Sequence, residues 1–437
     1  MKKASKMIEK TAIAGCLAAT MIASAAEKEK FPIYESLPLP RPENLKTFSE
    51  EDFAVDTVRI SKRTGKSLFV TPEGLVRMAG FYRETPEGRQ LWKNLSKQMV
   101  KILNGWDLLP ANFNRYTYGF SQLRTAAYVY ALSGCPELGE FVRGHILQAS
   151  RLPMEFWLHA ELRGYNREAP TGGLETAQVS GTVAIVMALA EDLFTPEERE
   201  EVQSALREKG LIPCLRFVRA RKQSGNVNNW LAVVATGAYL SAGYLGDEKA
   251  LDEAGDALLW FVNAAVEDDG SYGEGIGYFD YPVGSIIPAI AAMPQEERRE
   301  FLAGSGLRRS AEWTAYPYLY GRLPDGSPDL TRLHFGDNSF WGRPTLSLLA
   351  LLSELNGDPL ARYLGDTFGQ PGWEESQWNL ALAREASIPE VKPRSPEELG
   401  LPLVRSFDNG ENFIRSSWEP GALLLSLYTA GPTRVNY

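Results

Sequence analysis

The sequence predicts a mainly α-helical fold, in which helical hairpins form a toroid and the beginning of a β-sheet domain follows. From Glu73 to about Leu382, apolar residues recur at the i, i+3 and i+4 spacing of amphipathic helices. Short turns alternate with long polar loops through that stretch. Beyond about Pro389 the pattern changes to short β-like runs separated by turns that contain glycine.

The chain has 437 residues, of which 44% are hydrophobic and 11% aromatic, so it can bury a large core. Its formal net charge of −9 argues against a nucleic-acid-binding protein. An acidic substrate is still compatible with this charge, because a local arginine cluster can bind one.

Residues 1–25 are typical of an export signal. Four lysines precede the apolar run Thr11–Ile22, and Ala23-Ser24-Ala25 fits an A-x-A cleavage site. The run is too short to span a bilayer permanently, so we expect no integral membrane anchor. The residues before Cys16 also fit a lipoprotein signal, but apolar residues continue past Cys16. We therefore expect cleavage near Ala25 and a periplasmic or secreted protein.

Two cysteines, Cys135 and Cys214, remain after such cleavage. An oxidising compartment allows a disulfide between them, and two buried free thiols are equally compatible with the sequence. No cysteine spacing is typical of a metal site, so we expect no metal ion or other cofactor within this chain.

A helical domain is expected at 73–388, with the proline-rich and charged residues 26–72 wrapped around its surface. The expected helices are 73–84, 87–104, 119–133, 136–150, 174–192, 196–222 (with Gly210 and Pro213 as candidate breaks), 229–243, 248–267, 282–292, 295–304, 307–320, 344–355 and 358–367.

The connections between these helices alternate in length. The long polar ones are 105–118, 151–173, 223–228, 268–281 and 321–343. In an antiparallel helical array, alternate connections lie at the same end. We therefore expect the long loops to share one functional face, with the short turns on the opposite face.

Residues 389–437 are expected to begin a β-sheet domain. Leu403–Ser406, Phe413–Ser417 and Leu423–Tyr428 are β-like, and Asp408-Asn409-Gly410 and Glu419-Pro420-Gly421 are turn sequences. A three-stranded sheet with a free edge is not expected to be a whole domain, so we expect the sequence to be a fragment.

The loop Asp268–Tyr281 is long for a helix-to-helix connection and carries carboxylates and tyrosines on a glycine-rich backbone. Glu274, Tyr272 and Tyr278 are therefore candidate site residues, since tyrosine and glutamate can move protons. The alternative is structural: glycines that form turns, and aromatic side chains that fill the core.

Three polar or aromatic residues, Asn228, Asn229 and Trp230, open the next candidate segment just before an apolar helix. The structural alternative is an asparagine N-cap beside a buried tryptophan. That alternative accounts for one asparagine but not for several. Asparagine amides can also neutralise a carboxylate without adding a charge of their own.

Other candidates lie in the remaining long loops. Arg115 and Tyr118, with Arg124 in the helix that follows, suit sugar rings and carboxylates, although salt bridges are the structural alternative. The chain has only 3 histidines, and two of them, His159 and His334, fall in long loops. A lone histidine is more often structural, and His145, inside a helix, is the weakest candidate.

Four motifs occur in an order that resembles the heparinase II/III-like polysaccharide lyases. They are Asn228-Asn229-Trp230 opening a helix, Asp269-Gly270-Ser271-Tyr272-x-Glu274-Gly275-x-x-Tyr278, His334-x-Gly336-Asp337, and Phe413-Ile414-Arg415-Ser416-Ser417-Trp418. The resemblance covers roughly residues 75–437. It implies an α/α toroid followed by an antiparallel β-sandwich, here only begun, with a glycan cleft between them.

The resemblance also implies an activity, namely β-elimination in an acidic polysaccharide that contains uronic acids. It assigns carboxylate neutralisation to Asn229 and acid or base chemistry to Tyr278, with Tyr272 second. A histidine of the sandwich, often beside a divalent metal, commonly completes such a site, and it would lie beyond Tyr437. Trp230 stands where several branches of the family have a histidine.

Two other functions are compatible with the sequence. A glycoside hydrolase on a helical toroid needs paired acids, for which Asp268, Asp269, Glu274 and Asp280 are candidates. A non-catalytic protein that binds acidic glycans needs only the polar and aromatic loop residues.

Overall fold

A computed structural model describes residues 38–61, 70–108, 119–159, 162–164, 166–322, 324, 326, 328–333, 348–349, 351–368 and 390–429. The predicted export signal and three candidate site residues, Arg115, Tyr118 and His334, lie outside the described residues.

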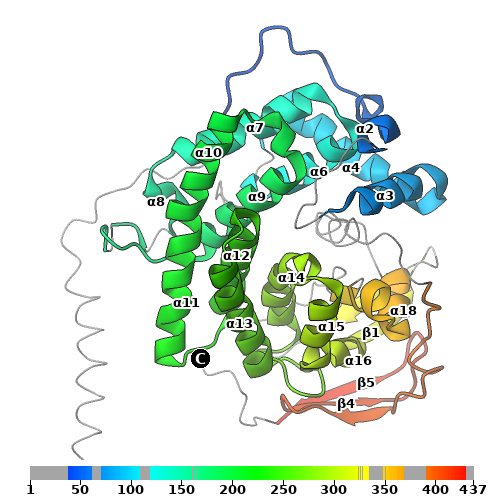
Figure 1. The fold of residues 1–437 in the computed structure, drawn as a ribbon. Coiled ribbons are helices and arrows are strands. Elements are labelled where there is room, and N and C mark those ends of the chain that lie inside the picture. Colours follow the sequence, from blue (N-terminus) through cyan, green and yellow to red (C-terminus); the bar gives the residue numbers. More distant parts are fainter. Residues whose placement is uncertain are drawn as a thin grey trace, which may run out of the picture.

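The described chain is mainly helical and ends in a small antiparallel sheet, as predicted (Figure 1). The helices are α2 (Thr57–Ser61), α3 (Pro72–Glu84), α4 (Pro86–Gly105), α6 (Gln122–Ser133), α7 (Pro136–Arg151), α8 (Met154–Trp157), α9 (Leu174–Ala190), α10 (Pro196–Ala205), α11 (Ile212–Ser224), α12 (Asn229–Leu245), α13 (Glu248–Ala265), α14 (Ile276–Ala292), α15 (Gln295–Ala303), α16 (Ser310–Ala315) and α18 (Pro359–Phe368).

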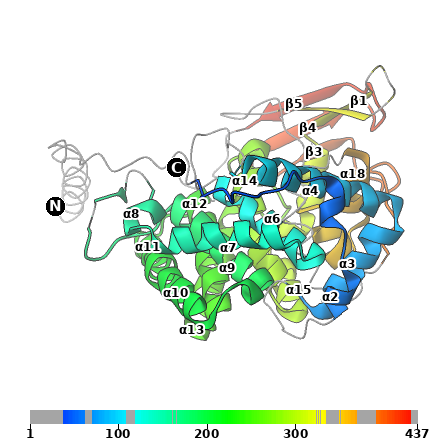
Figure 2. The same cartoon turned by 90° about the horizontal axis from the view of Figure 1, so that it is seen from above.

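Short 3₁₀ or π segments and five strands complete the fold. They are η1 (Glu50–Phe53), η3 (Glu191–Leu193), η4 (Leu206–Leu211), η5 (Gly306–Arg309), η6 (Leu351–Leu355), β1 (Tyr318–Arg322), β2 (Pro328–Arg332), β3 (Val404–Ser406), β4 (Glu411–Arg415) and β5 (Leu424–Tyr428). The helices follow one another around an arc, and β3–β5 lie against the α16 end of it (Figures 1 and 2).

Helices α6 and α9 run side by side in the same direction. Arg124 Nε, near the start of α6, donates to Thr182 Oγ1 in the middle of α9 at 2.9 Å. Further along α6, Tyr130 Oη donates to Asp192 Oδ2, just past the end of α9, at 3.1 Å. Helix α7, which connects them, returns on the outside of the arc. The starts of α6 and α9 therefore lie at the same end of the array, which agrees with the alternation of loop lengths.

Helix α12 continues this parallel inner row beside α9. A Cβ placed on Gly173, just before α9, would lie 3.6 Å from the Trp230 ring at the start of α12. One turn further along α9, a Cβ on Gly237 of α12 would lie 2.5 Å from Ala177 Cα. The second contact lies later than the first in both helices, so α9 and α12 run in the same direction. The approach at Gly237 is so close that only glycine fits, and it fixes how the two helices pack.

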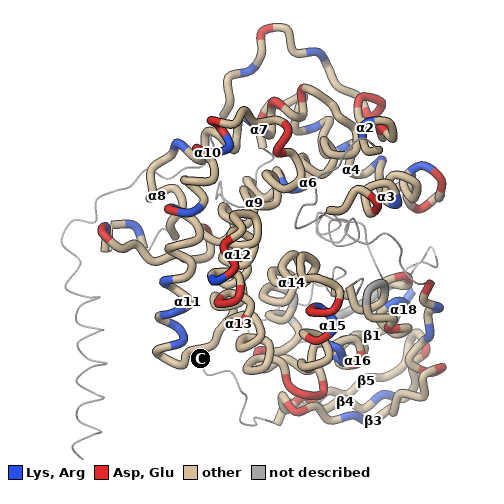
Figure 3. The backbone as a smooth tube through the Cα atoms, in the orientation of Figure 1, with Lys and Arg blue, Asp and Glu red and all other residues tan. Residues whose placement is uncertain are grey.

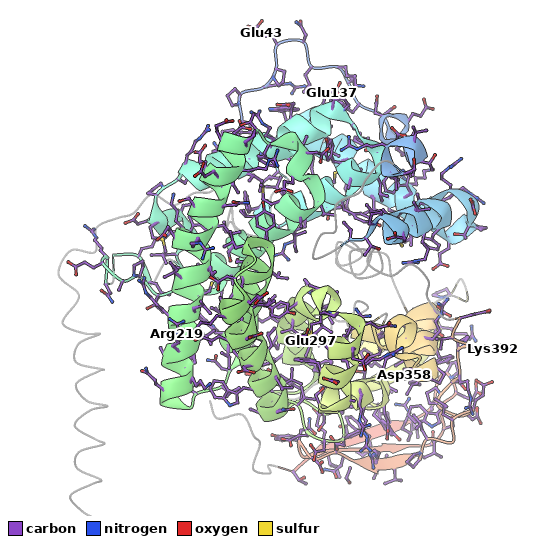
Figure 4. The ribbon with its side chains drawn as sticks, viewed as in Figure 1. Glu43, Glu137, Arg219, Glu297, Asp358 and Lys392 are labelled. Carbon is purple, nitrogen blue, oxygen red and sulfur yellow. The ribbon has the colours of Figure 1, made fainter. Side chains whose placement is uncertain are left out.

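Helix α14 begins six residues earlier than predicted, at Ile276 rather than at 282. Proline is favoured in the first turn of a helix, so Pro282 resembles a start. In the structure Pro282 lies inside the helix. Tyr278 is consequently on the first turn of α14 and not in a loop. Tyr239, in the second half of α12, donates a hydrogen bond at 3.5 Å to Glu297 of α15, labelled in Figure 4. Since α15 follows the end of α14, the late parts of α12 and α14 lie at the same end, and the two helices are parallel.

Two other helix predictions are wrong in part. The stretch 307–320 ends as a helix at Ala315, and Tyr318 begins the hairpin β1–β2. Tyr318 and Tyr320 are both buried with a less buried residue between them, which is the period of a strand. Gly210 is a candidate for a helix break in the sequence, but in the structure it lies in the π segment η4, which joins α10 to α11.

The C-terminal strands form one antiparallel sheet in the order β3-β4-β5. Its inner face buries Phe413 and Arg415 against the helices. The Arg415 guanidinium donates to the Tyr316 and Tyr318 carbonyls, both at 2.9 Å, so this sheet is tied to the segment that follows α16. The outer face exposes the cross-strand row Val404, Ile414 and Leu425.

Both described cysteines are buried in the core. Cys135 and Cys214 are buried free thiols, which is the second of the two predicted alternatives, and burial raises the pKa of Cys214 to about 12. Phe48 of the N-terminal segment and Asn104 of α4 exchange two hydrogen bonds.

In the part of the chain that the structure describes, no helix combines the length and apolar character needed to cross a membrane.

Candidate functional site

The starts of α9 and α12 bring His159, Glu175 and Trp230 together. His159 Nε2 lies 3.8 Å from Glu175 Oε1, and both side chains are almost completely buried. The His159 and Trp230 rings are inclined to each other with centroids 5.0 Å apart. Gly173 lets these groups approach, because a Cβ there would lie 3.0 Å from His159 Cβ. A polar pair therefore lies directly behind a partly exposed indole.

Asn228 occupies the N-cap position of α12, as the structural alternative predicts, but its side chain does not cap the helix. Its backbone is extended, with φ of −149° and ψ of 179°, which is the usual N-cap geometry. The side chain nevertheless makes no capping hydrogen bond, and Asn228 Oδ1 is buried without a hydrogen-bond partner among the described residues. An unsatisfied buried amide oxygen costs about 1–3 kcal/mol, so this amide is not used to stabilise the helix.

Asn229 and Trp230 form the first turn of α12 and are partly buried. The free N–H groups of a helix start favour negative charge, and two asparagine amides beside them add donors without adding a cation. The start of α12 can therefore bind an anionic group such as a carboxylate.

Tyr272 and Glu274 form a pair just before α14. The Tyr272 ring is completely buried against Phe279, and its hydroxyl donates a hydrogen bond to Glu274 Oε2. The other oxygen, Glu274 Oε1, is buried without a hydrogen-bond partner in the part of the chain that the structure describes. Burial raises the pKa of the Glu274 carboxyl group, while the hydrogen bond from Tyr272 lowers it by a smaller amount. Glu274 is thus held in place by Tyr272, and its other oxygen is buried and unpaired among the described residues.

Tyr278 lies on the first turn of α14, and its side chain is 37% exposed. Gly275, the N-cap of this helix, has φ of +79°, which residues with a side chain rarely adopt, so the turn that presents Tyr278 requires glycine here. Because α12 and α14 are adjacent and parallel, Tyr278 is at the same end of the array as Asn229.

The first part of the 268–281 segment serves the fold and not the site. Asp269 Oδ1 accepts from Ser271 Oγ at 2.7 Å, and Asp269 Oδ2 accepts from the backbone N–H of Asp408 at 2.7 Å. Gly270 has φ of +89°, and a Cβ there would lie 2.4 Å from the Arg309 carbonyl carbon. This turn joins the helices to the C-terminal sheet, and both Asp269 oxygens are committed to it.

The remaining predicted residues are scattered. Arg124 is buried between α6 and α9, where burial lowers its pKa to about 10. His145 is fully buried in α7 against Phe141, and burial lowers its pKa to about 3. The structure thus brings His159 to Trp230 and Tyr272 to Glu274, and it places Asn228, Asn229 and Tyr278 at the same end of the array.

One residue of this region is not indicated by the sequence. Phe217 of α11 stacks on Trp230 with centroids 6.3 Å apart. Nothing local to Phe217 indicates this contact, because it depends on how α11 packs against α12.

In the regions that the structure describes, no three histidine, cysteine, aspartate or glutamate residues are grouped as metal ligands. A scan against protein-family models finds no match to this chain, and a search of curated proteins finds no similar sequence. Function is therefore inferred from the residues themselves.

Proposed function

We propose that this protein is an exported polysaccharide lyase that cleaves a glycan containing uronic acids by β-elimination. The observation that carries the proposal is the start of α12, where the Asn228 amide occupies a cap position without capping. Because the side chain does not cap the helix, its amide nitrogen is left to donate a hydrogen bond to a substrate carboxylate at the helix start.

The reaction begins with the substrate carboxylate. The proton on the carbon next to that carboxylate becomes acidic enough to remove only when the negative charge is neutralised. Asn229 supplies an amide donor for this, with Asn228 beside it and the N–H groups of α12 behind it. Asparagine suits the role because it adds no positive charge that would hold the carboxylate in its ground state.

Tyr278 transfers the proton. In its phenolate form Tyr278 takes the proton from the carbon beside the carboxylate, and the electron pair left there forms a carbon–carbon double bond as the glycosidic C–O bond breaks. The phenol formed in this way then gives that proton to the departing oxygen, which returns Tyr278 to the phenolate. A single partly exposed tyrosine can perform both steps if the proton and the leaving oxygen lie on the same side of the sugar.

Trp230 holds the sugar ring. The exposed part of Trp230 offers an apolar surface to a ring, and His159 with Glu175 fixes the tilt of the indole. Tyr272 and Glu274 Oε1 are both buried, so this hydrogen-bonded pair positions the start of α14 and does not itself contact the sugar.

The hydrogen bonds of Asp269 and Glu274 favour elimination over hydrolysis. A hydrolase needs two carboxyl groups on either side of the scissile bond. Asp269 is excluded from such a pair because its oxygens accept hydrogen bonds at the junction with the sheet. Glu274 is hydrogen-bonded to a tyrosine and not to a second carboxyl group.

The test is an incubation of the purified protein with a panel of unsulfated and sulfated uronic-acid polysaccharides. We expect new ultraviolet absorbance from the double bond, in proportion to the new reducing ends. Reducing ends without absorbance would mean hydrolysis and would contradict the proposal. Binding without either product would mean a non-catalytic glycan-binding protein. In an active sample, Asn229→Ala should lower the rate by about a hundredfold or more.

A further inference from the structure

A row of stacked side chains leads from the candidate site to the end of α11. His159 contacts Trp230, and Trp230 stacks on Phe217 with an angle of 23° between the ring planes. Phe217 in turn contacts Arg221, whose guanidinium carbon lies 4.8 Å from the Phe217 ring centroid. Phe217 and Arg221 are four residues apart and so lie on the same face of the helix. The row ends in a cation, one aromatic ring beyond Trp230.

Arg221 differs from the other arginines of α11 in what it binds. Arg219, labelled in Figure 4, makes two hydrogen bonds to Glu253, at 2.7 and 2.6 Å. Arg216 donates to the Pro170 carbonyl at 3.2 Å. The Arg221 side chain has no hydrogen bond or ion pair to any residue that the structure describes. Basic residues recur along this helix (Figure 3), but Arg221 is the one among these three with an unused guanidinium.

Stabilisation of the helix end does not require this arrangement. A basic residue in the last turn of a helix interacts favourably with the helix dipole, and exposed Lys222 already does so. Arg221 is partly buried, and burial lowers its pKa from the usual arginine value. The Arg221 guanidinium packs against an aromatic ring, is partly removed from water and has no ion pair among the described residues. Such a cation can bind an anionic ligand.

We propose that Arg221 forms a second anion-binding subsite, which holds the carboxylate or sulfate of a neighbouring sugar in the chain bound at the start of α12. Trp230 and Phe217 form the apolar floor between the two positions. The guanidinium fork matches either anion with two parallel hydrogen bonds. The identity of the ligand rests on the proposed function, whereas the site itself rests on the contacts of Arg221. The substrate is then a polymer with acidic groups on successive units, and the protein is selective for chains longer than a disaccharide.

The experiment measures binding by titration calorimetry, in a Tyr278→Phe background that prevents turnover. The ligands are a uronic-acid disaccharide and the matching tetrasaccharide. We expect Arg221→Gln to weaken tetrasaccharide binding by about tenfold or more, since it removes a charged hydrogen-bonding partner. Disaccharide binding should stay within about twofold, because that ligand does not reach Arg221. Arg221→Lys should restore part of the loss, as lysine keeps the charge but not the fork.

Arg219→Gln is the matched control, since it removes the same charge from the same helix but from a residue already paired with Glu253. An equal loss in both variants would mean a general charge effect and would overturn the subsite. A sulfated, carboxyl-reduced tetrasaccharide distinguishes the two anions: dependence on Arg221 only with this ligand assigns sulfate, and only with the uronate assigns carboxylate.

The two proposals fail separately. Ultraviolet-absorbing products together with unchanged tetrasaccharide affinity in Arg221→Gln would overturn the subsite and leave elimination standing. A tenfold loss of affinity without any such product from the unsubstituted protein would support the subsite and overturn elimination. No binding of any acidic oligosaccharide would overturn both.

Discussion

Asn228, at the start of a helix, and Asn409, in the turn between β3 and β4, use their side-chain amides in opposite ways. At the junction between the helices and the sheet, Asn409 Nδ2 donates to the Tyr272 carbonyl at 3.1 Å, and Asn409 Oδ1 accepts from Glu411 N–H at 3.0 Å. Both ends of that amide are satisfied. At the start of α12, the Asn228 side chain makes no capping bond, and its oxygen has no hydrogen-bond partner among the described residues.

The comparison separates residues that hold the fold from residues available for chemistry. The two kinds meet within a few residues, since Asp269 and Ser271 bind the sheet while Glu274 and Tyr278 face the end of the helical array. A run of carboxylates and tyrosines is therefore not one site. Its first part is a junction, and its second part is the start of a helix that presents functional groups.

The largest expected effect is on the reaction. Tyr278→Phe should lower the elimination rate by about a hundredfold to ten-thousandfold, because it removes the group that transfers the proton. The free energy of unfolding should change by less than about 0.5 kcal/mol, because the side chain is on the surface. Initial rates of ultraviolet absorbance and urea unfolding measure the two quantities. An unchanged rate would remove Tyr278 from the mechanism.

The junction should show the opposite behaviour. Asn409→Ala leaves the Tyr272 carbonyl and the Glu411 N–H without their side-chain partner in a buried site. We expect a loss of about 2–4 kcal/mol of unfolding free energy, at about 1–3 kcal/mol for each buried group. Urea unfolding monitored by tryptophan fluorescence gives the value. A loss below about 0.5 kcal/mol would show that the junction does not hold the sheet to the helices.

Glu411 should make this junction sensitive to pH. Burial raises the pKa of Glu411 from 4.5 to about 7, and the nearby Asp269 charge adds to the increase, although hydrogen bonds from Trp313 and Asn409 oppose it. The folded protein therefore binds a proton that the unfolded chain releases between these two pH values. The stabilisation is fully present below pH 4.5 and is lost as the pH rises to about 7.

The expected loss across that window is at most about 3 kcal/mol, since one pKa unit corresponds to about 1.4 kcal/mol. Unfolding free energies measured at a series of pH values give the curve. Glu411→Gln keeps an acceptor for Trp313 and should flatten it. Glu274 contributes in the same direction, because burial raises its pKa too. An identical slope in Glu411→Gln would show that Glu411 does not titrate in this range.

The smallest effect is expected at Asn228. Asn228→Ala should leave the unfolding free energy unchanged or raise it, because it removes a buried oxygen that has no hydrogen-bond partner among the described residues. Loss of a working asparagine cap would instead cost about 1 kcal/mol. The same urea experiment as for Asn409→Ala decides this. A loss of 1 kcal/mol or more would mean that Asn228 caps α12 after all.

The sequence predicts the helical array well because it depends on local apolar spacing and on the alternation of short and long connections. It fails where a local signal is overruled by packing. Pro282 resembles a helix start, yet α14 begins at Ile276, and Tyr318 and Tyr320 look helical in a window but pair with β2. These differences arise from contacts between segments distant in sequence.

For the site, residue types are predictable but their use is not. The sequence identifies Asn228 as a helix N-cap, and only the geometry reveals that its amide is left over. Asp269 and Glu274 look equivalent in the sequence. Their roles differ because Asp269 accepts a hydrogen bond from the backbone of Asp408, 139 residues away in the sequence. Arg221 becomes a candidate only once Phe217 is seen between it and Trp230.

The central claim is that the amides at the start of α12 recognise a substrate carboxylate. The most direct measurement compares the affinity for a uronic-acid oligosaccharide with that for its carboxyl-reduced, neutral counterpart, with and without Asn229→Ala in the Tyr278→Phe background. We predict that the parent protein prefers the acidic ligand by about tenfold or more, and that Asn229→Ala removes most of that preference. An equal preference with and without Asn229 would contradict the account.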